Sequence, residues 1–172
     1  SNMYNDAYQW FSRYAALNGV KDEFYYFKTG SFALNAKNGL AADSAANGYI
    51  AAFPDKSRGY VFKIKAAMLL DSTNANGLLI QALNMNAQFL LKDVTANKQK
   101  LIDNYGQMLV YYNEIKNYDE AVVMCDKILE LAPGDASMIK YREQFAKNAA
   151  LMKNNPNKAG AKPAATPPAK SN

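Results

Sequence analysis

The chain has 172 residues, a net charge of +5 and a pI near 9.1, which allows one domain or a short array of repeats. Hydrophobic residues make up 49% and charged residues 20%, so the composition supplies a core and excludes a wholly disordered protein. The absence of histidine removes the most frequent general base and metal ligand, and a single cysteine excludes an intrachain disulfide.

The first predicted helix covers residues 4–17 and has no helical partner before it. Its alanine Ala7 is followed seven residues later by Tyr14, a spacing that recurs in later helices. Ser1-Asn2 resembles the remnant of a cleaved tag. We therefore expect the chain to begin in the middle of a helical repeat, as an N-terminally truncated piece of a longer protein.

Two helix pairs are predicted next, over residues 22–53 and 57–91. Asn38-Gly39 has the composition of the turn inside the first pair. The polar segment 71–77 has that of the turn inside the second. Its alternating oxygen side chains are slightly similar to a calcium loop, but the acidic ligand twelve positions into such a loop is missing. We expect a turn there and no metal site.

The third pair, residues 96–131, has the clearest helical periodicity. Tyr105, Met108 and Tyr112 recur at the spacing of a buried stripe, and Lys116-Asn117-Tyr118 indicates a tight turn. A second apolar stripe, centred on Ala121, follows that turn. Pro133-Gly134 then predicts the end of the second helix.

A final helix over residues 136–153 is expected to cap the array. Asp135 is its predicted N-cap, and Ile139, Phe145 and Met152 form its predicted apolar stripe. Residues 154–172 are rich in proline, alanine and lysine and contain no large apolar side chain, which predicts a flexible tail. Without the four lysines among the last twenty residues, the net charge falls from +5 to +1. The basic character is therefore weak evidence for nucleic-acid binding.

The segment from Leu101 to Asp135 resembles the tetratricopeptide repeat, a helix–turn–helix of about 34 residues. That family places an aromatic residue early in its first helix (helix A), a second aromatic seven residues later, an alanine in its second helix (helix B), and a proline twelve residues beyond the alanine. Those places hold Tyr105, Tyr112, Ala121 and Pro133 here. At the position where the family has a small residue in helix A, this chain has Leu109. Either the helix pair is wider there, or Gly106 relieves the contact.

A second, earlier unit fits the same frame, with Tyr26, Gly30, Ala42 and Pro54. The resemblance implies an all-α fold: a right-handed α-α superhelix of about three full repeats, an N-terminal half-repeat and a C-terminal capping helix. Residues 1–153 would form this domain, and 154–172 the tail. In this frame Gly30 lies where the two helices of a pair approach most closely, because a Cβ there would hold them apart.

Motifs for catalysis are absent from the sequence. No glycine-rich phosphate loop occurs, and Cys125 lies on the apolar face of a predicted helix, where a structural thiol is expected. The carboxylates fall at helix starts or on predicted solvated faces. We expect no enzyme activity and no cofactor.

The resemblance implies that helix A of each repeat lines a concave groove that receives a peptide or a partner's helix. The family's paired lysine and asparagine clamp for a terminal carboxylate is absent; aromatic and cationic side chains suit an acidic or apolar ligand instead. Packing between helices is the alternative interpretation for the phenylalanines. The candidate groove residues are Phe24, Phe27, Lys28, Ser31, Arg58, Phe62, Lys65, Asp103, Gln107 and Asn113, with Val61 and Val110 beside them.

The predicted function is a non-enzymatic protein–protein interaction scaffold with a protein or peptide partner. Alternatives are a structural spacer or oligomerisation module that stacks on upstream repeats, and a regulatory domain of a larger enzyme or sensor. No apolar run approaches the roughly 18 residues of a membrane span. The content of tyrosine and asparagine is similar to that of repeat proteins of bacterial cell envelopes, which favours the envelope or periplasm over the cytoplasm.

Overall fold

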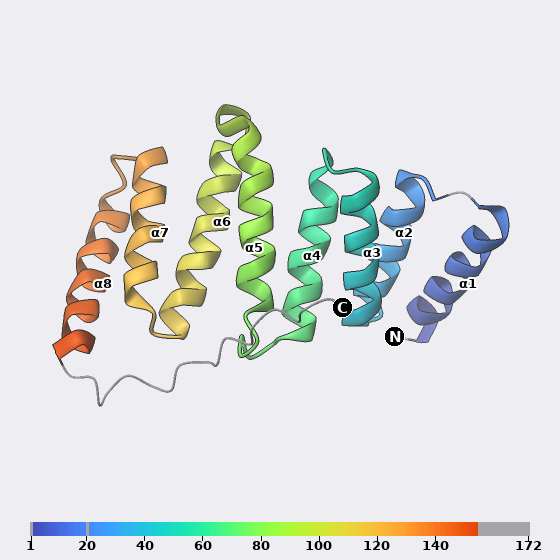
Figure 1. Ribbon diagram of the computed structural model, residues 1–172, viewed down its shortest axis with the longest axis horizontal. Helices are drawn as coiled ribbons and strands as arrows, with labels where there is room; N and C mark the ends of the chain where they lie inside the picture. The colour runs from blue at the N-terminus through green and yellow to red at the C-terminus, as the bar shows by residue number, and fades with distance from the viewer. Residues whose placement is uncertain (1, 20, 155–172) are drawn as a thin grey trace, which may run out of the picture. The chain divides into compact units, whose positions relative to one another are not determined.

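The computed structural model describes residues 2–19 and 21–154, and the regular structure of this part is entirely helical (Figure 1). The all-α prediction is confirmed. The predicted tail lies outside the described residues, except for Asn154, which ends the last helix. The elements are α1 (Asn2–Asn18), α2 (Glu23–Asn35), α3 (Gly39–Ala52), α4 (Ser57–Leu70), α5 (Leu78–Leu90), the 3-10 helix η1 (Leu91–Asp93), α6 (Val94–Glu114), α7 (Tyr118–Leu131) and α8 (Ala136–Asn154).

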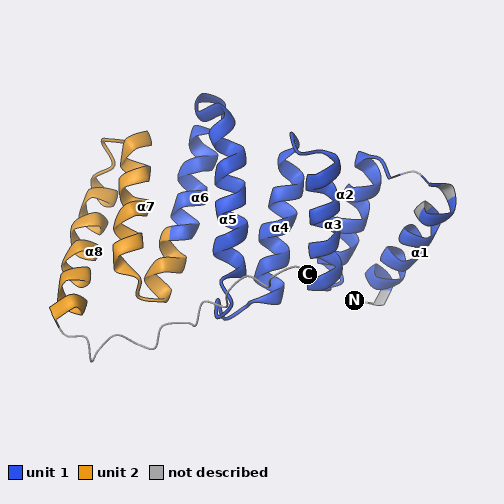
Figure 2. Ribbon diagram, viewed as in Figure 1, with its two compact units in different colours: residues 1–108 blue, residues 109–172 orange. Residues whose placement is uncertain are grey.

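The chain divides into two compact units, residues 1–108 and 109–172, with the boundary inside α6 (Figure 2). In the first unit each helix from α1 to α5 packs on the next, and α2 also contacts α4. In the second unit α7 packs on α8. No described helix is both long enough and apolar enough to cross a bilayer.

Local helix geometry recurs in the chain at an offset of 79 residues. Helices α3 and α7 have the same length, because 118 − 39 and 131 − 52 both equal 79, and α2 and α6 end at Asn35 and Glu114, again 79 apart. The turns between them also correspond. A lysine with positive φ (Lys37 at 55° and Lys116 at 57°) is followed by an asparagine N-cap in each case. The end of the first helix, the turn and the whole second helix therefore correspond between residues 23–52 and 102–131, although α6 begins earlier than α2 in this frame.

The core of the first unit is built around the alanines of α3. Ala42 and Ala46 are fully buried, and their small side chains let α2 and α4 approach α3 closely. Tyr49, also fully buried, packs against Phe62 of α4 and donates a hydrogen bond to Glu23 of α2, with 2.8 Å between the oxygens. Burial and then this bond to Glu23 raise the pKa of Tyr49.

Gly30 allows a close contact, but with a different helix from the predicted one. A Cβ at this position would lie 2.4 Å from Cδ2 of Phe62, and the three atoms nearest to it all belong to this ring of α4. The missing side chain therefore makes room for an aromatic ring of the following pair. At Gly106, one of the two alternatives offered for the Leu109 position, an added Cβ would meet no described atom within 4 Å.

Helix α1 presents a different face from the predicted one. Tyr8 and Phe11 are half-buried, and the ring of Phe11 stacks on Tyr25 of α2 at 6.0 Å. Tyr14 stands seven residues after Ala7, as the fully buried Tyr49 stands seven after Ala42, but it is 52% exposed and stacks on Trp10. The seven-residue spacing from Ala7 therefore does not mark the buried side of this helix.

In the second unit α8 covers α7 through Phe145, which stacks on Tyr118 at 6.1 Å, and through Ala149. The predicted N-cap is confirmed: the Asp135 carboxylate accepts hydrogen bonds from the backbone amides of Ser137 and Met138. Ile139 is 41% exposed, so its place in the predicted apolar stripe is wrong. Ion pairs from Arg142 to Asp126 and from Lys153 to Asp119 join the two helices at their surface.

Candidate functional site

Helix α2 carries the aromatic part of the predicted groove. Phe24 is 57% exposed, whereas Phe27 is half-buried and stacks on Phe62 at 6.4 Å. The Lys28 ammonium lies 5.2 Å from the ring centre of Phe24 and 5.9 Å from that of Phe27. These cation–π contacts hold the lysine against the rings and keep its charge at the surface.

Helix α4 adds a second cation and a buried ring. The Arg58 guanidinium lies 4.4 Å from the ring centre of Phe27, on a helix that α2 also contacts. Phe62 is only 7% exposed, because Gly30, Phe27 and Tyr49 surround it. Phe62 therefore forms part of the floor between the helices, and Phe24 is the ring most available to a partner.

A surface groove of about 440 Å³, the α2/α4 groove, lies between the C-terminal halves of these helices. Its two large exposed apolar side chains are Met68, 44% exposed, and Leu69, 40% exposed. They stand beside the exposed Lys65. The full lining is Ser31, Leu34, Asn35, Phe62, Lys65, Met68 and Leu69.

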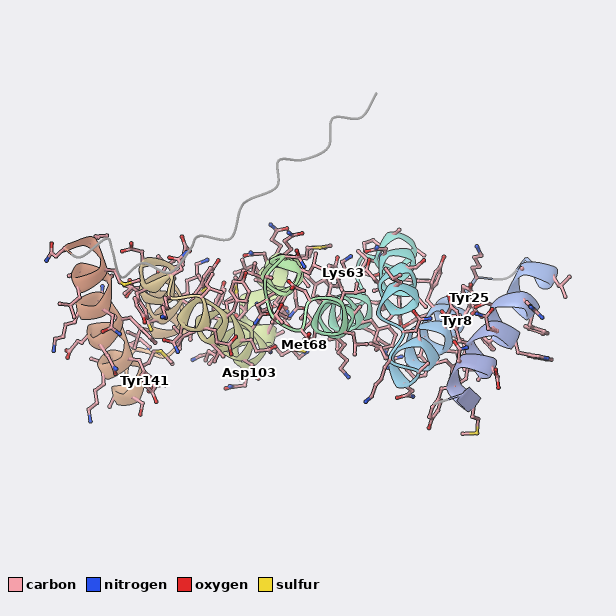
Figure 3. The ribbon with its side chains drawn as sticks, turned by 90° about the horizontal axis from the view of Figure 1, so that it is seen from below. Tyr8, Tyr25, Lys63, Met68, Asp103 and Tyr141 are labelled. Atoms are coloured by element: carbon pink, nitrogen blue, oxygen red, sulfur yellow. The ribbon has the colours of Figure 1, made fainter. Side chains whose placement is uncertain are left out.

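Among the described residues that line the α2/α4 groove, Lys65 is the one charged side chain, and no carboxylate accompanies it. Lys63, two residues earlier on α4, is neutralised elsewhere: its ammonium lies 2.7 Å from the Asp43 carboxylate of α3 and 2.8 Å from the Asn47 side chain. Figure 3 shows Lys63 and Met68 on different sides of the helix. Helix α4 thus has one side that is ion-paired to α3 and another that is open and cationic.

Asp103 and Gln107 both line a second hollow of about 200 Å³, the α4–α6 pocket. There Asn86 donates to the Asn104 side chain at 2.8 Å, and Asn104 donates to the Leu83 carbonyl at 3.0 Å. The remaining predicted groove residue, Asn113, is exposed and belongs to the second unit. The full lining is Ser57, Val61, Asn86, Leu90, Lys100, Asp103, Asn104 and Gln107.

Several lining residues were not among the predicted ones, although a signal for them exists. Leu34 and Asn35 follow Ser31 by three and four residues, as Met68 and Leu69 follow Lys65. Continuing the helical period by one turn would have found all four. Asn86 carries no such signal, because a lone asparagine in a helix is usually exposed.

Two further side chains with reactive groups, Asp71 and Cys125, are buried outside these hollows. Both carboxylate oxygens of Asp71, which is 3% exposed, accept a hydrogen bond from the backbone amide of Asn76, and one accepts from that of Leu78. The carboxylate thus organises the turn into α5. Burial raises the pKa of the fully buried Cys125 to about 11. No group of three acidic or cysteine side chains suited to a metal ion occurs within residues 2–19 and 21–154.

Comparison with protein-family models, curated proteins and solved structures gives no match for this chain.

Proposed function

We propose that this chain is a non-enzymatic protein–protein interaction scaffold whose partner docks on the surface formed by α2 and α4. The observation that carries the proposal is the α2/α4 groove, where Met68 and Leu69 are exposed beside Lys65 and no carboxylate lines the wall. Exposed apolar side chains beside a fixed positive charge favour a particular kind of ligand. Such a ligand covers the apolar side chains and neutralises the charge. The partner is therefore an acidic segment with an apolar anchor.

The resemblance to tetratricopeptide repeats supports this proposal. The recurrence of the same helix ends and turn geometry at an offset of 79 residues agrees with a chain assembled from repeated helix pairs. We propose that the pairs stack in the right-handed manner of that family. Helices α2 and α4 correspond to its groove-lining first helices, so Phe24, Lys28 and Arg58 would extend the binding surface along the α2/α4 groove.

The test is a pull-down from the native lysate with three folded chains: the intact protein, Met68→Glu and Leu91→Glu. Leu91 is the matched control, because it is 50% exposed against 44% for Met68 and lies in η1, outside the groove. Circular dichroism checks that each variant is helical. The captured partner is then identified and titrated directly against all three.

A partner held by the intact chain and by Leu91→Glu, and lost with Met68→Glu, is the expected result. Equal affinity of the partner for all three chains would place the binding surface elsewhere, and a chain that captures nothing would contradict the scaffold function. Because Met68→Glu places a carboxylate in a cationic groove, an acidic partner should lose affinity through repulsion as well as through lost apolar contact.

A second function, self-association, is favoured by one observation on α1. Met3, Trp10 and Leu17 are spaced by seven residues, so they share one side of the helix, and they are 71%, 70% and 87% exposed. In an oligomerisation module this stripe would pack on a second copy of the chain. Sedimentation equilibrium would then show an oligomer that Trp10→Glu dissociates, and a monomer at every concentration would exclude it.

A further inference from the structure

Helices α1, α2 and α3, together with Lys21, line a third hollow, of about 200 Å³ and open to solvent, whose lining differs in kind from that of the α2/α4 groove. Six of its residues carry hydroxyl groups, and one, Lys21, is cationic. No carboxylate lines it. We define this cavity as the hydroxyl pocket; its lining is Tyr8, Ser12, Lys21, Tyr25, Tyr26, Thr29, Ser44, Ala45 and Gly48.

Most of these hydroxyl groups have free hydrogen-bonding capacity. Thr29 donates to the Tyr25 carbonyl at 2.9 Å, but the hydroxyls of the three tyrosines, Ser12 and Ser44 bond to no other side chain or backbone group in the described part of the chain. In the described part of the chain, no buried side-chain oxygen or nitrogen atom lacks a hydrogen-bond partner. The unbonded hydroxyl groups of the partly buried residues must therefore be in contact with solvent. Each can both donate and accept.

The walls that carry these hydroxyls are held by aromatic packing. Tyr25 meets Tyr26 edge-on at 5.1 Å and stacks on Phe11 at 6.0 Å, and Figure 3 shows Tyr8 of α1 next to Tyr25 of α2. A Cβ at Gly48 would lie 2.6 Å from the ring of Tyr26. The missing side chain of Gly48 therefore makes room for this ring. The tyrosine positions are thus set by the fold before any ligand arrives.

The chemistry of the lining restricts the kinds of ligand that the hydroxyl pocket can bind. Without a carboxylate it offers nothing to an ammonium group, and one exposed lysine is a weak site for a phosphate dianion. A purely apolar ligand would leave the hydroxyls unpaired. Groups that donate and accept at once match ligands that do the same, and tyrosine rings add apolar faces.

The volume of the hydroxyl pocket also limits the size of the ligand. A volume of 200 Å³ holds about six or seven waters at roughly 30 Å³ each, below the range of drug-sized sites. From this geometry we propose that the hydroxyl pocket binds one neutral sugar residue, a monosaccharide or the end of a longer glycan. Burial and then the neighbouring tyrosines raise the pKa of Tyr25 further above neutral pH, so its hydroxyl is a donor there, as that of any tyrosine is.

Saturation-transfer NMR on the full chain tests this proposal, with D-glucose, D-galactose and N-acetyl-D-glucosamine as neutral probes and D-glucuronate as the charged one. We expect transfer to at least one neutral sugar at roughly millimolar affinity. Amide shifts should then centre on residues 25–29 and 44–48. Ser44→Leu, which puts a larger side chain into the pocket from an exposed helical position, should abolish the transfer. Tyr25→Phe, which removes one hydroxyl and keeps the ring, should weaken it.

The matched control is Ser31→Leu, which makes the same change in the α2/α4 groove. It should leave sugar binding intact and weaken a protein partner, whereas Ser44→Leu should do the reverse, so the two proposals fail independently. Three results would overturn the sugar site: no transfer to any neutral probe, transfer to glucuronate alone, or undiminished binding by both Ser44→Leu and Tyr25→Phe.

Discussion

At the scale of single residues, Gly30 sets how closely α2 and α4 can approach. Alanine is the better helix former by up to about 1 kcal/mol, yet its Cβ would lie 2.4 Å from Cδ2 of Phe62. That ring is confined by Phe27 and Tyr49 and cannot move freely. We expect Gly30→Ala to lower the free energy of unfolding by about 1–3 kcal/mol, as overpacked cores do.

Gly106 provides the opposite case within a helix of the same chain. An added Cβ there meets no described atom within 4 Å, so Gly106→Ala should raise the free energy of unfolding by up to about 1 kcal/mol. Urea denaturation of both variants measures the two changes. Equal effects in both would show that helix propensity, and not the Phe62 contact, determines the result at Gly30.

The buried thiol of Cys125 should be almost inert in the folded protein. With a pKa of about 11, roughly one thiol in a thousand is ionised at pH 8, compared with about one in four for a free cysteine. A thiol reagent should therefore label Cys125 slowly in buffer and rapidly in urea. Fast labelling of the native chain would show that α7 opens far more readily than its burial indicates.

The same pKa shift predicts a pH dependence of stability. A folded-state pKa above the unfolded value of about 8.5 means that the folded chain holds this proton more tightly. The contribution to stability is complete below about pH 8.5 and is lost as the pH rises toward 11. Thermal unfolding at pH 7, 9 and 10.5 checks this, and Cys125→Ala should flatten the profile.

At the scale of elements, the buried pair Asn86–Asn104 fixes α5 against the part of α6 in the first unit. Asn104 is 2% exposed and bonds both to Asn86 and to the Leu83 carbonyl. Asn104→Ala removes both bonds and leaves buried polar groups unpaired, so we expect a loss of about 1–3 kcal/mol in the free energy of unfolding. Asn84→Ala, at an exposed position of α5, is the control and should change it by less than about 0.5 kcal/mol.

Helix positions were predictable from the sequence because periodicity and turn chemistry act locally. The apolar stripe around Tyr105, the turn at Asn117 and the stop at Pro133 each depend on neighbours within a few residues. The burial of particular side chains was harder to predict. A stripe shows that one side of a helix is apolar, but not which neighbour covers it, as the exposed Tyr14 and Ile139 demonstrate.

For the candidate site, too, some residues could be predicted from the sequence and others could not. Three predicted positions, Ser31, Phe62 and Lys65, line the α2/α4 groove, because a repeat frame assigns each position to a side of its helix. The hydroxyl pocket could not be predicted, since it needs three helices to bring Tyr8, Tyr26 and Ser44 together. Its only trace in the sequence is a local abundance of tyrosine.

At the scale of the whole molecule, an acidic partner can be attracted either by the net charge of +5 or by the lysine of the α2/α4 groove, and the two cases predict different effects of charge substitutions. General attraction depends on total charge, whereas docking at the α2/α4 groove depends on Lys65. Lys65→Glu and Lys140→Glu both lower the net charge by two, but Lys140 lies exposed on α8, in the other unit.

If the partner docks in the groove, Lys65→Glu weakens binding of the acidic segment and makes its dependence on salt shallower, while Lys140→Glu retains the intact chain's behaviour. The reason is screening: at about 0.1 M salt the Debye length is roughly 10 Å, so only charges near the ligand contribute strongly. Titrations of the partner at about 50, 150 and 500 mM salt measure both slopes. Matching losses in the two variants would mean that total charge attracts the partner and that the groove does not select it.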